Sequence, residues 1–300
     1  MIILDGGMSR ELQRLGAPFR QPGWSALALM EAPHFVEQVH AEFAAAGADI
    51  ITTNSYAIVP FHIGDARFDR CGSELATLAG RLARRGADVR PGTRVAGSLP
   101  PIFGSYRPDL FDSTRVAAYL DVLVGGLRPF VDLWLGETLS SIAEAEAVIR
   151  AVQGTGLPLW MSFTLRDEAD ALARPPMLRS GELVADAAAW AAASAVDALL
   201  FNCSQPEVME PAVRVTAAVF QAAGCKTPIG VYANAFEPAE GHDKANENLM
   251  DMREDLGPAS YGDWADRWAA AGATIIGGCC GIGVSHIHGV AQRLACVAAD

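Results

Sequence analysis

Short aliphatic runs recur along the 300 residues, each ending close to a glycine, aspartate, asparagine or serine. Most of them lack strict alternation with polar residues, which is typical of parallel strands buried on both faces. The pattern therefore predicts eight parallel strands, at Ile2–Asp5, Asp49–Ser55, Arg94–Ser98, Val131–Gly136, Leu159–Thr164, Ala198–Cys203, Ile229–Ala233 and Thr274–Gly278.

Helical patterns occupy the gaps between these runs, and a last one closes the chain. The predicted helices are Ser25–Ala46, Cys71–Arg85, Asp112–Pro129, Ser140–Val152, Leu183–Ala195, Pro206–Ala223, Tyr261–Ala271 and His286–Ala298. Strands that alternate with helices in this way predict an α/β fold, the (β/α)8 TIM barrel. A doubly wound sheet is the alternative, and it is disfavoured because no G-x-G-x-x-G turn follows the first strand.

Composition limits the partners that the chain can have. The formal net charge is −12 and 51% of the residues are hydrophobic, so a full core can form under an acidic surface. Such a surface argues against nucleic acids and anionic membranes as partners and leaves small molecules as substrates. We see no signal peptide and no transmembrane segment, which predicts a cytoplasmic protein. Whether it forms a homo-oligomer stays open.

Three cysteines follow predicted strands. Cys203 ends the sixth strand, and Cys279 and Cys280 follow the eighth. In a closed barrel the carboxyl ends of all strands meet at one rim, where reactive groups gather, so these three thiols can converge above the barrel axis. Three thiols at one point predict a site for a soft or borderline metal ion, most simply Zn²⁺ with one coordination position open. Packing or redox chemistry are the other roles that adjacent cysteines can have.

Cysteine ligands favour one kind of zinc chemistry over another. Three anionic thiolates make the metal electron-rich, so a substrate thiol bound as the fourth ligand loses its proton and stays nucleophilic. This suits alkylation of a thiol better than hydrolysis, for which histidine ligands are the usual choice.

Five motifs of the chain resemble, in order, those of the zinc-dependent homocysteine S-methyltransferases, which include S-methylmethionine-dependent and betaine-dependent enzymes. They are Leu4-Asp-Gly-Gly-Met-Ser-Arg-Glu-Leu, Thr52-Thr-Asn-Ser-Tyr, Gly136-Glu-Thr-Leu, Phe201-Asn-Cys-Ser and Gly277-Gly-Cys-Cys-Gly. The resemblance extends from about residue 2 to 295, and the Asn-Cys and Gly-Gly-Cys-Cys elements are its specific part. It implies one homocysteine-binding barrel domain over residues 1–300.

The resemblance also implies roles for individual residues. Zn²⁺ is expected on the three cysteines, with the sulfur of homocysteine as the fourth ligand. Asp5 and Glu137 match the acidic positions that hold the amino group of the substrate, and we assign the catalytic role to them. Gly6 and Thr53 match positions that touch the amino-acid end. Asn202 is expected to shape the pocket, and so is Asn234, although the Tyr232-Ala-Asn-Ala-Phe-Glu sequence around it departs from the family's commoner form.

The expected reaction moves a methyl group from a sulfonium donor, S-methylmethionine or S-adenosylmethionine, to homocysteine and gives methionine. Thr138 follows Glu137 where betaine users tend to have an aromatic residue, which favours a sulfonium donor. Tyr56, Tyr106, Trp134 and Phe163 are candidates for an aromatic face that would bind a betaine-like donor. Another thiol or selenol acceptor, or a non-enzymatic redox or metal-binding protein, are the remaining alternatives. The long segments Leu165–Gly181 and Phe236–Ser260 are predicted to be loops over the site or lids.

Overall fold

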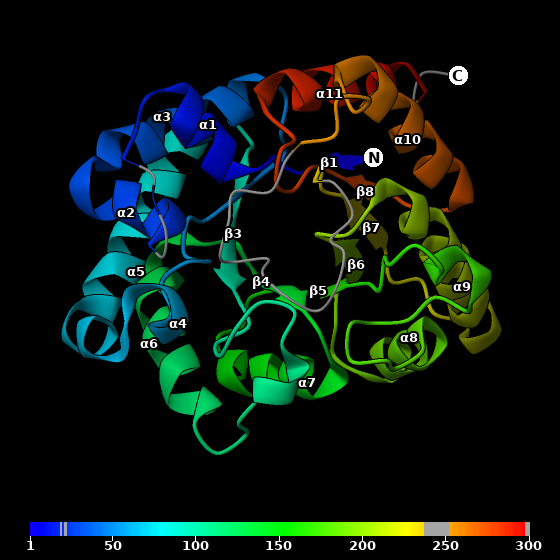
Figure 1. Cartoon of the computed structure of the whole chain (residues 1–300), viewed down its shortest axis with the longest axis horizontal. Coiled ribbons are helices and arrows are strands. Elements are labelled where there is room, and N and C mark those ends of the chain that lie inside the picture. The colour runs from blue at the N-terminus through cyan, green and yellow to red at the C-terminus, as the bar shows by residue number, and fades with distance from the viewer. Residues whose placement is uncertain (19, 21–22, 237–251, 298–300) are drawn as a thin grey trace.

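Parallel strands form the centre of the structure, a computed structural model that describes residues 1–18, 20, 23–236 and 252–297 (Figure 1). They are β1 (Ile2–Ile3), β2 (Ile50–Thr52), β3 (Arg94–Leu99), β4 (Leu133–Leu139), β5 (Leu159–Thr164), β6 (Ala198–Asn202), β7 (Ile229–Tyr232) and β8 (Ile275–Ile276). The sheet order is β1-β8-β7-β6-β5-β4-β3-β2, and a parallel bridge between Leu4 and Ile50 joins its two ends. The ring is therefore closed, which confirms the predicted barrel and excludes the doubly wound sheet.

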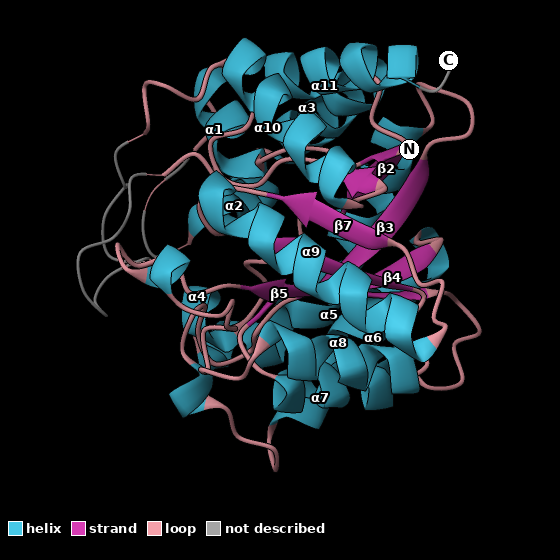
Figure 2. Cartoon of the chain, turned by 90° about the vertical axis from the view of Figure 1, so that its right-hand side faces the viewer, coloured by secondary structure: helices cyan, strands magenta, loops and turns pink. Residues whose placement is uncertain are grey.

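Helices surround this ring on the outside, as the views along and across the barrel show (Figures 1 and 2). They are α1 (Met8–Arg14), α2 (Trp24–Glu31), α3 (Pro33–Ala45), α4 (Pro60–Ile63), α5 (Asp65–Ala87), α6 (Val116–Leu127), α7 (Ile142–Val152), α8 (Val184–Ala193), α9 (Pro206–Ala223), α10 (Pro258–Ala271) and α11 (Val284–Val297). Short 3-10 helices lie at Pro108–Leu110, Arg128–Phe130 and Ala171–Ala173. Within the described residues, no helix is both long and apolar enough to cross a membrane.

Apolar side chains fill two separate layers. A small inner cluster fills the barrel, and a large outer cluster lies between the strands and the helices. In β6, Ala198 and Leu200 belong to the inner cluster, whereas Leu199 and Phe201 belong to the outer one. Because successive side chains of a strand point to opposite faces and both faces are buried here, the strand sequences show no polar alternation.

Two features of the helices differ from the sequence expectation. The single helix predicted over Ser25–Ala46 is wrong, because the chain leaves the helical conformation at Ala32, where φ is −150°. Pro33 causes this break, since a proline disfavours the helical conformation of the residue before it. In addition, α1 and α4 were not predicted. The predicted bounds of α9 agree with the structure.

Two helix ends are stabilised by local contacts that their sequences provide. Ser141 caps α7: its hydroxyl accepts a hydrogen bond from the backbone N–H of Glu144, and the Glu144 carboxylate accepts one from the backbone N–H of Ser141. This capping box satisfies donors that a helix start leaves free. Gly272 ends α10 with a φ of 118°, a conformation in which glycine carries little cost.

Candidate metal centre and substrate cavity

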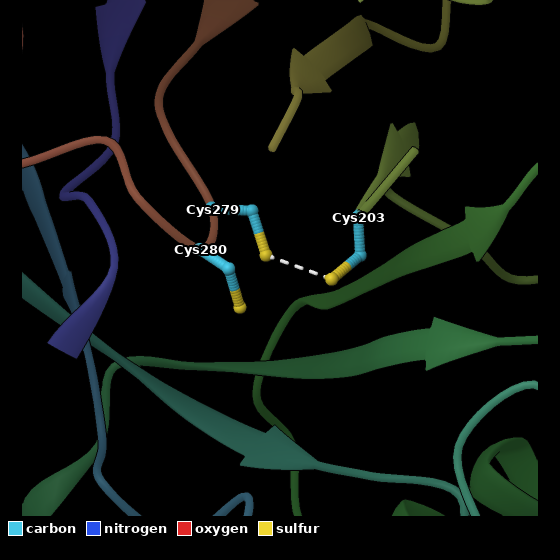
Figure 3. A group of neighbouring side chains, drawn as sticks. All are labelled: Cys203, Cys279 and Cys280. Atoms are coloured by element: carbon cyan, nitrogen blue, oxygen red, sulfur yellow. Dashed lines mark hydrogen bonds between the residues drawn. The ribbon is translucent and has the colours of Figure 1, made fainter. Parts of the chain in front are cut away.

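Three cysteine sulfurs meet at the carboxyl-terminal rim of the barrel. Cys203 follows β6, and Cys279 and Cys280 lie in the loop after β8; β7 separates these two strands in the sheet. The three Sγ atoms lie within 4.8 Å of one another, and those of Cys203 and Cys279 are 3.1 Å apart. All three side chains point toward a common point (Figure 3). The convergence predicted from the barrel topology is thus present.

Backbone geometry holds the cysteine pair against the start of the chain. The N–H of Cys279 donates to the carbonyl of Ala233 at 2.9 Å, and the carbonyl of Cys280 accepts from Ala235 at the same distance. A Cβ atom at Gly7 would lie 2.5 Å from the carbonyl oxygen of Cys279. The turn after β1 therefore needs glycine here, because the loop that carries the cysteines packs directly on its backbone.

Cys203 has an unusual backbone conformation. Its φ is 52°, in the left-handed region that non-glycine residues rarely adopt. Such strain persists where the surroundings enforce it, and it is frequent at functional sites. Here the backbone N–H of Cys203 donates to the carbonyl of Tyr232 at 3.3 Å, on the neighbouring strand. The strained turn directs the buried Cys203 sulfur toward the cysteine pair.

The three thiols share their protons unequally. Hydrogen bonds from Cys279 and Cys280 lower the pKa of the Cys203 thiol, and the same hydrogen bonds raise the pKa values of Cys279 and Cys280. Without a neighbouring cation the cluster therefore holds one thiolate more readily than three. A bound divalent cation reverses this preference, since thiols that coordinate a metal are deprotonated. The donor set thus fits a soft or borderline metal ion.

A cavity of about 130 Å³ opens beside the sulfurs. Its floor and walls come from the carboxyl ends of several strands and from the loops that follow them, as expected for a barrel of this type. Among the described residues that line it there is no lysine or arginine, while Asp5 and Glu137 both line it. The cavity therefore favours a positively charged group in its ligand.

Of the two carboxyl residues of the cavity, Asp5 is buried and Glu137 is half-buried. Asp5 accepts hydrogen bonds from the backbone N–H and the hydroxyl of Thr52, at 2.7 and 2.9 Å. Glu137 accepts a hydrogen bond from the hydroxyl of Ser98. Burial raises the pKa of Asp5 to about 8 and that of Glu137 to about 7, in both cases against the opposing effect of these hydrogen bonds. A ligand ammonium group close by would favour the ionised forms.

An irregularity in β4 positions Glu137. The pairing register of β4 with β5 shifts between Gly136 and Leu139, and Thr138 has a φ of 60°. Bulges of this kind turn a side chain toward a site. Asn202 supports the irregularity, because its Nδ2 donates to the Thr138 hydroxyl at 2.7 Å.

The other predicted substrate residues fall into two groups. Gly6 and Thr53 line the cavity. Asn202 and Asn234 are buried but are not among its lining residues. The Oδ1 of Asn202 accepts from Ser162 at 2.8 Å, whereas the Oδ1 of Asn234 has no hydrogen-bond partner among the described residues. A role of these two asparagines in substrate binding stays a prediction.

Aromatic side chains of the cavity match the expectation only in part. Tyr56 and Tyr106 line the cavity, as proposed. Trp134 and Phe163 are fully buried in the outer core between strands and helices, so their assignment to a donor-binding face is wrong. The sequence analysis missed the further aromatic lining residues, which are Trp24, His62, Tyr232 and Phe236.

Of the two long segments, the first contributes directly to the site. Arg179, in the Leu165–Gly181 segment, places its guanidinium 4.9 Å from the centre of the Tyr106 ring. It also forms a 2.7 Å ion pair with Asp167. In the second segment, Phe236–Ser260, residues 237–251 lie outside the described part of the chain.

Comparison with known proteins gives matches over almost the whole chain. The sequence model of the homocysteine S-methyltransferase family matches residues 2–294. Homocysteine S-methyltransferase of Escherichia coli K12 is 31% identical over 309 residues, which cover 93% of this chain and 91% of that protein. Selenocysteine methyltransferase of Astragalus bisulcatus is 27% identical over 331 residues, covering 97% of this chain and 92% of that protein.

Solved structures give the same result. The metallated form of the homocysteine methyltransferase MmuM from Escherichia coli superposes with a TM-score of 0.76 at 27% sequence identity, covering 98% of this chain and 96% of that chain. The oxidized form of the same protein also has a TM-score of 0.76.

Proposed function

Because this chain belongs to the homocysteine S-methyltransferase family, we propose that it transfers a methyl group from a sulfonium donor to the sulfur of homocysteine and yields methionine. One observation carries this proposal. Three cysteine sulfurs converge at one side of a cavity that is also lined by two carboxyl groups and by no described lysine or arginine. An amino acid with a thiol at one end and an ammonium group at the other fits this arrangement.

Cys203, Cys279 and Cys280 would hold Zn²⁺. Zn–S bonds of about 2.3 Å in tetrahedral geometry separate the sulfurs by about 3.8 Å. This value falls between the 3.1 Å contact of Cys203 with Cys279 and the 4.8 Å limit of the whole group. When bound, zinc would supply an open coordination position and lower the pKa of a thiol that occupies it.

The chain's own groups would orient both substrates. Asp5 and Glu137 would accept hydrogen bonds from the homocysteine ammonium group and keep it partly desolvated near the floor of the cavity. Trp24, Tyr56 and Phe236 would face the donor, and their ring faces attract a cationic sulfonium centre. Holding the two reactants in line supplies a large part of the rate through proximity.

The reaction is a single displacement. The homocysteine sulfur, having released its proton to solvent, forms a bond to the methyl carbon while the bond from that carbon to the donor sulfur breaks. The donor leaves with the electron pair as a neutral thioether, and no general base is needed at the methyl centre. The residue after Glu137 is Thr138, which has no aromatic ring. This position would therefore leave room for a sulfonium donor such as S-methylmethionine or S-adenosylmethionine.

A selenol acceptor is the second candidate. The similarity to selenocysteine methyltransferase of Astragalus bisulcatus favours it, and the chemistry at the sulfur cluster would be the same. A cytoplasmic location stays a prediction from the sequence, and the oligomeric state stays open.

A zinc-loaded assay tests the proposal. Homocysteine is offered with S-methylmethionine, S-adenosylmethionine or glycine betaine in turn, and methionine is measured together with the zinc content. Stoichiometric zinc and methionine formation with a sulfonium donor are expected, and Cys279→Ala should lose both. A protein that takes up no metal and transfers no methyl group, yet oxidises reversibly, would instead support the redox alternative.

A further inference from the structure

The hydroxyl of Tyr106 reaches the metal centre from a distant part of the chain. Tyr106 lies in the segment after β3, and its hydroxyl donates a hydrogen bond to the Sγ of Cys203 at 2.9 Å. The two residues are 97 positions apart in the sequence. The contact therefore connects the segment after β3 directly to the sulfur of the residue that follows β6.

Tyr106 is held in place for this contact from two directions. Its backbone φ is 63°, a left-handed conformation that a bulky residue rarely adopts. Behind the ring, the guanidinium of Arg179 lies 4.9 Å from the ring centre and attracts its face. Arg179 is itself fixed by the ion pair with Asp167, whose carboxylate also accepts the backbone N–H of Gln205 at 3.0 Å. A rotation of the tyrosine would therefore break several contacts.

The hydrogen bonds that the two neighbouring thiols make to this sulfur do not persist when a cation binds. Cys279 donates its thiol proton to the Sγ of Cys203 at 3.1 Å, but coordination removes that proton. The backbone N–H of Cys203 is already committed to the carbonyl of Tyr232. Among the hydrogen bonds of the described residues, the one from Tyr106 is then the contact that remains at the Cys203 sulfur.

We propose that Tyr106 is a positioning residue that tunes the metal centre by donating a hydrogen bond to the Cys203 thiolate. This inference rests on the proposed function, since it assumes that the three sulfurs hold a metal ion. A hydrogen bond to one ligand withdraws negative charge from that sulfur and fixes its orientation. Partners of this kind typically change metal affinity or activity by about 10- to 100-fold when they are removed.

Tyr56 offers a matched control. It lines the same cavity, but its hydroxyl pairs with the hydroxyl of Ser105 at 2.7 Å rather than with a sulfur. Tyr56→Phe and Tyr106→Phe each remove one phenolic oxygen and leave the ring in place. Only the second variant removes a hydrogen bond to a proposed metal ligand.

The test uses the full chain loaded with Co²⁺ in place of Zn²⁺ under reducing conditions. In Tyr106→Phe, the sulfur-to-cobalt charge-transfer band should move to longer wavelength, because a thiolate without its hydrogen bond releases an electron more easily. Zinc affinity, measured by competition with a chromophoric chelator, should fall by about 10-fold or more. Tyr56→Phe should leave both quantities at the wild-type values.

Three outcomes would overturn the inference. They are a Tyr106→Phe protein with an unchanged band and unchanged zinc affinity, equal shifts in both variants, or a wild-type protein that forms no cobalt complex. The last outcome would also remove the metal from the proposed function. In contrast, the expected band shift in Tyr106→Phe, together with a wild-type protein that makes no methionine, would support the role of Tyr106 and contradict only the proposed reaction.

Discussion

One buried histidine should lower the free energy of unfolding in acid. His40 in α3 is completely buried, and neither of its ring nitrogens has a hydrogen-bond partner among the described residues. Burial lowers its pKa from the ordinary 6.5 to about 3. Gly86 of α5 packs so closely that a Cβ there would lie 2.4 Å from the Cβ of His40, which leaves little room for water.

The sign of the effect follows from proton binding. Below pH 6.5 the unfolded chain takes up a proton at His40, whereas the folded chain stays neutral down to about pH 3. The free energy of unfolding must therefore fall as the pH decreases through this window. At pH 5, which is 1.5 units below the ordinary pKa of 6.5, the loss is about 2 kcal/mol, at 1.36 kcal/mol for each unit.

Two carboxyl groups act in the opposite direction, so a single unfolding curve is not sufficient. The raised pKa values of Asp5 and Glu137 mean that the folded chain binds protons more tightly there, which stabilises it as the pH falls. A comparison of variants cancels these contributions. Urea unfolding at pH 7.5 and pH 5 should show a decrease in the wild-type protein that is about 2 kcal/mol larger than in His40→Leu.

The control variant lies on the same helix. His34 of α3 is exposed, so His34→Leu should keep the full pH dependence of the wild-type protein. If His40→Leu and the wild-type protein lose the same free energy of unfolding between the two pH values, the argument from burial is refuted.

Three further substitutions test separate parts of the structure. Gly7→Ala should lower the free energy of unfolding by about 1–3 kcal/mol in chemical denaturation and weaken zinc binding, because its Cβ would press on the loop of Cys279; unchanged values of both would contradict the close approach. Ser141→Ala should lower the free energy of unfolding by about 1 kcal/mol through loss of the α7 cap. An unchanged free energy of unfolding would argue against the capping box. Glu137→Gln should raise the KM for homocysteine by about 10- to 100-fold, the value of one hydrogen bond to a charged group, without changing the zinc affinity; an unchanged KM would argue against its ammonium contact.

The barrel and its cysteine site were predictable from the sequence for one reason. Parallel strands that close on themselves bring all their carboxyl ends to one rim, so residues next to strand ends can be placed together without knowledge of loop paths. Cys203 and the 279–280 pair satisfy this condition. The prediction needed only the strand positions, which the aliphatic runs mark clearly.

Strand parity explains the error at the aromatic residues. In β4, Leu133 and Leu135 belong to the inner cluster and Glu137 lines the cavity, so the odd positions face inward. Trp134 has the opposite parity and packs in the outer core. The same alternation buries Phe163 on the outer side of β5. Counting along the strand would have excluded both residues from the cavity.

Other parts of the site depend on loop geometry, which the sequence pattern does not encode. Trp24 reaches the cavity from the start of α2 with a φ of 45°, and His62 reaches it from the short α4. Neither residue stands next to a strand. The contact of Arg179 with Tyr106 likewise joins two loops whose relative position is determined only by the complete fold.

The packing of the cysteine loop on the turn after β1 also has a consequence for biosynthesis. Asp5 follows β1 and is synthesised long before β8, whereas two of the three sulfurs follow β8. A nascent chain that still lacks β8 contains only one of the three site thiols, that of Cys203, and its barrel is still open between β1 and β7. If the three sulfurs hold a metal ion, as the proposed function requires, the complete site can form only once synthesis of the barrel is nearly finished, and bound metal would mark chains that have completed the fold.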